Sequence, residues 1–160
     1  MNRCKLFVVA VAFMLATFNI VMADTLMPWG QATSVQPVYQ KQKVVYDLTA
    51  ASEQQLANIL SRAGYLSRLN GNDPFETKII MVIHGDAIPF FSTARFKQYR
   101  ELMELAHSQT LNETVEFRMC QASAKLRGLA PADIHGFVTM VPMADAEIVR
   151  LQKAGYAYMQ

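Results

Sequence analysis

The stretch KIIMVI at residues 78–83 constrains the fold more than any other part of the sequence. After the lysine, five apolar residues follow one another without interruption. Successive side chains of a strand point to opposite faces of a sheet, so a strand of this composition is buried on both faces. Burial on both faces is typical of parallel sheets, whose crossover helices cover the two sides. We therefore expect a parallel sheet.

Strand-like and helix-like patterns alternate along the chain from Lys43 onward. The strand-like runs are KVVYDL, KIIMVI, VEFRMC, FVTMVP and a short closing YAYM. Helical spacing predicts a first helix after Ser52, which forms a capping-box pattern with Gln55, and further helices over residues 93–107, 121–129 and 144–154. This order predicts a doubly wound α/β sheet with right-handed crossovers and helices on both faces.

Residues 1–23 have the features of a secretory signal peptide. Arg3 and Lys5 precede a long apolar run, and Ala23 is a small residue at the expected cleavage point. We expect export to the periplasm, with an uncleaved membrane anchor as the alternative because the apolar run is long. Residues 24–42, with two prolines and a glycine, are expected to form an extension, and residues 43–160 a single domain.

Charge argues against two classes of partner. Without Arg3 and Lys5, the 15 basic residues become 13, which equals the 13 acidic residues. A neutral domain has no electrostatic basis for binding nucleic acid or an anionic membrane surface. After cleavage of the leader we therefore expect neither nucleic acid nor a membrane as a partner.

Cys120 ends the run VEFRMC and is the only cysteine beyond the leader. An odd cysteine in an exported protein indicates intermolecular pairing or a reactive thiol, whereas the alternative is a small buried apolar residue. Cys120 also precedes a predicted helix. Free N–H groups at a helix start favour a thiolate by roughly 0.3 to 1 kcal/mol, which lowers its pKa by less than about one unit.

Two further residues are expected near Cys120. Strand alternation places Arg118 on the same face, where it either supports the thiolate or pairs with Glu116. His84 follows KIIMVI, and the carboxyl ends of parallel strands meet at one edge of a sheet. His84 is therefore a candidate proton donor near the thiol, with a hydrogen bond to a loop as the alternative. The dispersed histidines lack zinc-ligand spacing, so we expect neither a metal nor a cofactor.

Three stretches together carry a resemblance to a known family. They are VIHGDAI, the cysteine followed by QASAKLRGL, and the terminal VTMVPMADAEIVRLQKAGYAY. Over residues 43–160 the chain resembles the DsrE/DsrF-like family of sulfur-handling proteins. The resemblance implies a three-layer α/β fold with a mostly parallel five-stranded sheet, assembly into homo-oligomers or related hetero-oligomers, and a persulfide carried on the cysteine that matches Cys120.

These observations lead to a functional hypothesis with one alternative. The hypothesis is a periplasmic sulfur carrier rather than a turnover enzyme: Cys120 takes sulfur from a sulfane donor and passes it to an acceptor protein. Arg118 and the helix start would hold the sulfur anion, and His84 would protonate a leaving group. The alternative is a non-catalytic oligomeric binding or assembly module with an inert buried cysteine. A thiol oxidoreductase is disfavoured because no Cys-x-x-Cys motif is present.

Overall fold

Five strands pair in parallel in the order β4-β3-β2-β1-β5. The computed structural model describes residues 29–160. The strands are β1 (Lys43–Leu48), β2 (Lys78–Ile83), β3 (Val115–Cys120), β4 (Val138–Val141) and β5 (Ala157–Met159). Residues 79–83 of β2 are all buried, in the middle of the sheet. The prediction of a doubly wound, mostly parallel five-stranded sheet is confirmed, and every strand pairing in this sheet is parallel.

Four α-helices and three 3-10 segments connect these strands. The α-helices are α1 (Glu53–Leu69), α2 (Arg100–Thr110), α3 (Gln121–Leu126) and α4 (Ala144–Lys153), and the 3-10 segments are Gly85–Phe91, Thr93–Arg95 and Pro131–Asp133. The Ser52 cap is present, because its Oγ accepts a hydrogen bond from the Gln55 N–H at 3.2 Å. None of the helices within residues 29–160 has the length and apolar content needed to cross a bilayer.

Two predicted helices have wrong bounds. The helix expected over 93–107 begins only at Arg100, because Ser92 forms an antiparallel bridge with Ile134 and the chain makes a short 3-10 turn before α2. The helix expected over 121–129 ends at Leu126. Gly128 takes a φ of 72°, and the Leu129 N–H donates back to the Ala124 carbonyl at 3.0 Å, which is a glycine-dependent helix stop.

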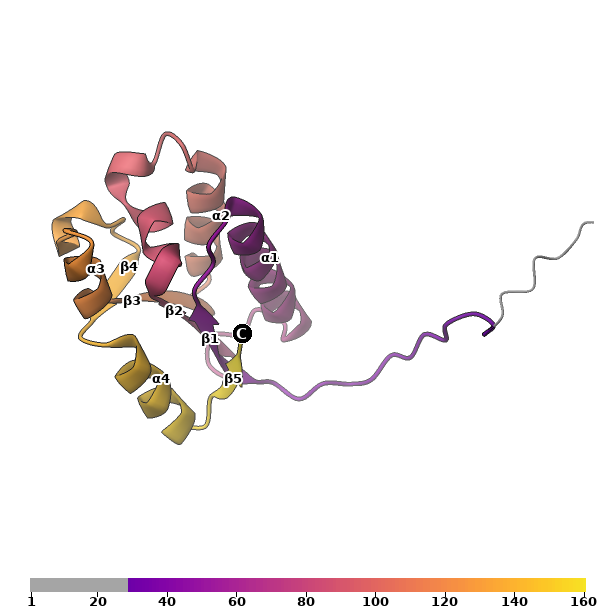
Figure 1. Ribbon diagram of the computed structural model, residues 1–160. Helices are drawn as coiled ribbons and strands as arrows, with labels where there is room; N and C mark the ends of the chain where they lie inside the picture. The colour runs from indigo at the N-terminus through magenta and orange to yellow at the C-terminus, as the bar shows by residue number, and fades with distance from the viewer. Residues whose placement is uncertain (1–28) are drawn as a thin grey trace, which may run out of the picture. The chain divides into compact units, whose positions relative to one another are not determined.

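The sheet separates two apolar cores of unequal size. α1 and α2 lie on one side of the sheet and α4 lies on the other (Figure 1). The chain steps from β1 to β4 in one direction and then returns to place β5 beyond β1, so a right-handed crossover puts α4 on the opposite face. The α4 core consists of Val45, Ile80, Val82, Cys120, Ala144, Ile148 and Leu151.

The amino-terminal part of the chain is described only in part. The predicted signal peptide, residues 1–23, lies outside the described residues. Residues 29–42 of the predicted extension are exposed and form no helix or strand. Pro37–Gln160 forms one compact unit, in which the Lys41 ammonium pairs with the Asp73 carboxylate at 2.9 Å.

His135 lies in an aromatic cluster beside the larger core. Its ring stacks on Phe137 at a centroid distance of 5.7 Å and meets the edge of Phe96 at 5.4 Å. Its Nε2 atom is buried and has no hydrogen-bond partner among the described residues. Burial lowers the pKa of His135 below its ordinary value of 6.5, because the charged imidazolium would lose its hydration there.

This burial predicts a pH-dependent stability. The unfolded chain takes up the His135 proton near pH 6.5 and the folded chain only at lower pH, so stability falls as the pH drops below about 6.5. Urea unfolding across this range measures the effect. In His135→Phe the loss of stability between pH 6.5 and pH 5 should be smaller than in the wild type; an identical loss would contradict the assignment.

Candidate functional site

Cys120 lies at the junction of β3 and α3. It is the last residue of the strand and the N-cap of the helix, as the sequence predicts. The residue is 3% exposed and packs in the α4 core beside Val82 and Ala144. The sulfur-carrier hypothesis requires a reachable sulfur, so this burial is the feature that any mechanism has to accommodate.

The surroundings of the sulfur favour its anionic form. Burial raises the pKa of Cys120, but hydrogen bonds from the Ser123 side chain and from the backbone N–H groups of Ser123, Ala144 and Ala122 outweigh it, and the net pKa is lowered. The Ser123 nitrogen lies 3.4 Å from the sulfur. Ala144 is the first residue of α4. The starts of two helices therefore face one sulfur atom, where the sequence predicted only one.

A hollow of about 560 Å³ lies beside the residues that follow Cys120 in the chain. It is lined by Gln121, Ala122, Lys125, Leu129, Ala130, Pro131 and Pro142. Both residues that follow Cys120 in the chain therefore form part of its wall. The Ala122 N–H donates to the Pro142 carbonyl at 3.3 Å, which joins the start of α3 to the segment before α4.

Arg118 lies on the same face as Cys120 but is engaged by carboxylates. Its guanidinium binds Glu116 at 2.7 Å and also binds Glu147 of α4. Arg150 contacts the same Glu147 carboxylate at 2.7 Å. Hydrogen bonds from Arg150 and Arg118 lower the pKa of Glu147 to about 2, against the opposing effect of burial. The Arg118 to Glu116 pair that the sequence left open is therefore present, together with a second carboxylate.

His84 lies at the predicted edge of the sheet and binds Asp47. The last pair between β2 and β3 joins Ile83 to Met119, so the next residues in register are His84 and Cys120. The His84 ring contacts the Asp47 carboxylate through Nε2, and the Tyr158 hydroxyl donates to the other Asp47 oxygen at 2.7 Å. Since Asp47 belongs to β1, the His84 ring reaches toward β1, on the side away from β3.

Sequence reasoning missed Asp47 and Tyr158. Asp47 is the one charged residue after the lysine in KVVYDL, and a carboxylate in an otherwise apolar strand is a signal that could have been used. Tyr158 could not be assigned in this way, because its contact with Asp47 depends on β5 lying next to β1.

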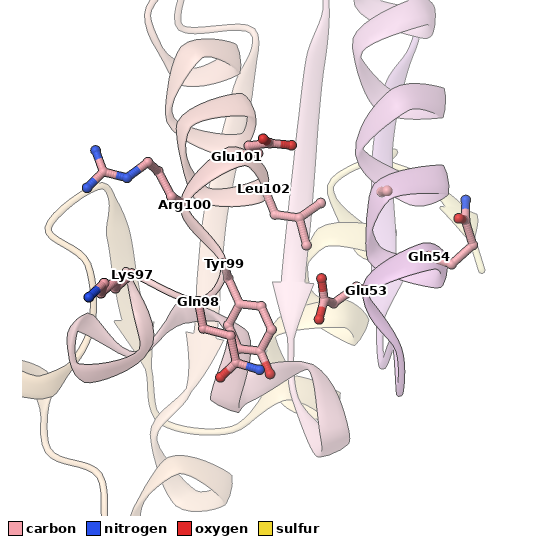
Figure 2. A pocket seen from close by; sticks show the side chains of 9 residues that line it. Glu53, Gln54, Lys97, Gln98, Tyr99, Arg100, Glu101 and Leu102 are labelled. Carbon is pink, nitrogen blue, oxygen red and sulfur yellow. The ribbon is translucent and has the colours of Figure 1, made fainter.

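A separate cavity of about 470 Å³ lies between α1 and the start of α2. Glu53 and Tyr99 project into it from opposite sides (Figure 2). Its charged side chains balance, with Glu53 and Glu101 against Lys97 and Arg100. None of the side chains that line it is a thiol, so Cys120 is the better candidate for sulfur chemistry. Residues 29–160 hold no group of three or more histidine, cysteine or carboxylate side chains placed to bind a metal.

Comparison with known proteins settles the family. The model of the DsrE/DsrF-like family matches residues 42–160. The chain belongs to the DsrE/DsrF-like family. This membership suggests a role related to sulfur metabolism and agrees with the observed α/β fold.

The fold is also similar to a solved structure from Methanobacterium thermoautotrophicum. That structure, the protein of unknown function MTH1491, is 19% identical in sequence, with a TM-score of 0.57 over 74% of this chain and 98% of that chain. At this identity the likeness concerns the fold alone. Among the curated proteins, no match is found.

The hydrogen bonds to the sulfur predict the effect of a conservative substitution. In Ser123→Ala the hydroxyl donor is lost, so the pKa of Cys120 should rise. The midpoint of the pH dependence of Cys120 alkylation, read at this residue by mass spectrometry, measures the change. Gln121→Ala, one residue after the cysteine, is the matched control and should leave the midpoint in place; an unshifted midpoint in Ser123→Ala would contradict the assignment.

Proposed function

We propose that the protein is a periplasmic sulfur carrier that holds sulfane sulfur as a persulfide on Cys120. The observation that carries the proposal is the position of the Cys120 sulfur against N–H groups from the starts of α3 and α4, which lowers its pKa. A thiolate is the form that reacts with sulfane sulfur. Family membership supports a role in sulfur metabolism but does not by itself identify a carrier.

The proposed transfer consists of two thiol exchange steps. The Cys120 thiolate attacks the sulfane sulfur of a polysulfide or of a donor persulfide. The donor S–S bond breaks, the donor sulfur leaves with the electron pair, and a new S–S bond forms on Cys120. An acceptor thiolate then attacks the outer sulfur, and Cys120 leaves as a thiolate. No net oxidation or reduction occurs, so the cycle needs no cofactor.

The surrounding residues take distinct roles in this proposal. The N–H groups of Ser123 and Ala144 hold the negative charge each time Cys120 is a thiolate, since the Ala122 N–H already donates to the Pro142 carbonyl. For His84 to supply a proton to the departing donor sulfur, its ring has to leave Asp47 and turn toward β3 during the transfer. Because Arg118 is neutralised by two carboxylates, the N–H groups take over the anion-holding role that the sequence assigned to it.

Sulfur transfer at a residue that is 3% exposed requires a local opening. The hydrogen bond from the Ala122 N–H to the Pro142 carbonyl joins two residues that line the hollow, and Ala122 is two residues from Cys120. Separation of these two segments would expose Cys120 to a donor or acceptor protein bound over the hollow. We propose that such partners meet the exported protein, as a homo-oligomer, in the periplasm.

The burial of Cys120 also supports a second candidate function. A cysteine packed among Val45, Ile80 and Val82 can serve as a small apolar core residue. The protein would then be a non-catalytic oligomeric binding or assembly module. In that case Cys120 reacts with a thiol reagent quickly after unfolding and hardly at all in the folded state.

Sulfur loading distinguishes the two functions. In chains that all carry Cys4→Ser, we expect intact-mass analysis after exposure to polysulfide to show a sulfur-sized adduct, and none when Cys120→Ser is added. His84→Ala should load more slowly, roughly 10- to 100-fold if it acts as the proton donor. An adduct of the same size after Cys120→Ser is added, or none on the folded chain with Cys4→Ser alone, would overturn the carrier proposal.

A further inference from the structure

Within residues 29–160, the α4 helix is attached to the sheet by one small apolar patch and one ion pair. Ala144, Ile148 and Leu151 provide the apolar contacts. Glu147, whose side chain is 10% exposed, binds Arg118 of β3. Arg150 also binds Glu147, but it belongs to α4 itself and therefore adds no attachment to the sheet.

This ion pair lies next to the sulfur on both elements. Arg118 is two residues before Cys120 on the same face of β3, and Glu147 is three residues after Ala144, one turn into α4. The pair therefore joins the strand that holds the sulfur to the helix turn whose first residue, Ala144, packs with Cys120. The effect of a helix start on an anion falls off within the first turn, so a small displacement of α4 changes the stability of the thiolate.

We infer that Glu147 is a positioning residue for the Cys120 thiolate, because its ion pair with Arg118 keeps the first residue of α4, Ala144, packed with Cys120. Arg118 acts in the same way, through α4 rather than on the sulfur itself. This inference goes beyond sulfur carriage, since it concerns the ionisation of the thiol whatever the thiol reacts with.

The inferred effect of Glu147 on the pKa of Cys120 is opposite in direction to the effect of its charge alone. A carboxylate near a thiol disfavours the thiolate, so removal of its charge alone would lower the pKa of Cys120. Loss of the positioning contact has the opposite effect, because the start of α4 moves away from the sulfur. The direction of the change therefore separates the two roles.

Two substitutions of equal charge test the inference. Glu147→Gln and Glu116→Gln each remove one carboxylate that binds Arg118, but only Glu147 lies on α4. In the full chain carrying Cys4→Ser, the pH midpoint of Cys120 ionisation is measured from thiolate absorbance and from residue-resolved alkylation. We expect Glu147→Gln to move this midpoint upward by roughly 0.2 to 0.7 pH unit and Glu116→Gln to leave it unchanged or lower.

A second substitution, together with melting curves at each pH, serves as the control for folding of the variants. If Glu147→Gln does not fold, Glu147→Asp keeps the charge but shortens the side chain, and the same upward movement is expected. A midpoint that stays in place or moves downward in the folded variant, or that moves upward equally in Glu116→Gln, overturns the inference. This measurement does not depend on sulfur loading. The role of Glu147 can therefore be decided even if the carrier proposal fails.

Discussion

Residues 79–83 of β2 are buried on both faces, and this double burial requires a layer of structure on each side of the sheet. The two layers are unequal, because α1 and α2 cover one face and α4 alone covers the other. A helix about 10 Å wide covers roughly two strands spaced about 4.8 Å apart. The outer parts of the second face are therefore left without an apolar cover, and polar side chains occupy them.

Two groups of polar side chains lie on the face of the sheet that α4 covers only in part. The ion pairs through Glu116, Arg118 and Glu147 join β3 to α4, and the hydrogen-bonded group of Asp47, His84 and Tyr158 joins the end of β2 to β1 and β5. Cys120 packs with Ala144 at the start of α4. The strand order thus determines where a polar group can be placed without an uncompensated cost of burial.

Features set by local pattern could be predicted from the sequence, and features set by strand neighbours could not. The ends of β2 and β3 follow from hydrophobic periodicity, and with them the placement of His84 and Cys120 at one edge. The contact between Tyr158 and Asp47 spans 111 residues and that between Arg118 and Glu147 spans 29. Each depends on where the last crossover returns to the sheet, which the alternation of strands and helices does not specify.

The use of backbone N–H groups at Cys120 has a physical advantage over a cation in a buried position. A guanidinium placed against the sulfur would have to give up its hydration, whereas the N–H groups at the starts of α3 and α4 already lack helical partners. Backbone donors also cannot rotate away when the sulfur changes its charge. An environment of this kind stabilises the same atom as an attacking thiolate and as a leaving group, which are the two states that the proposed transfer alternates between.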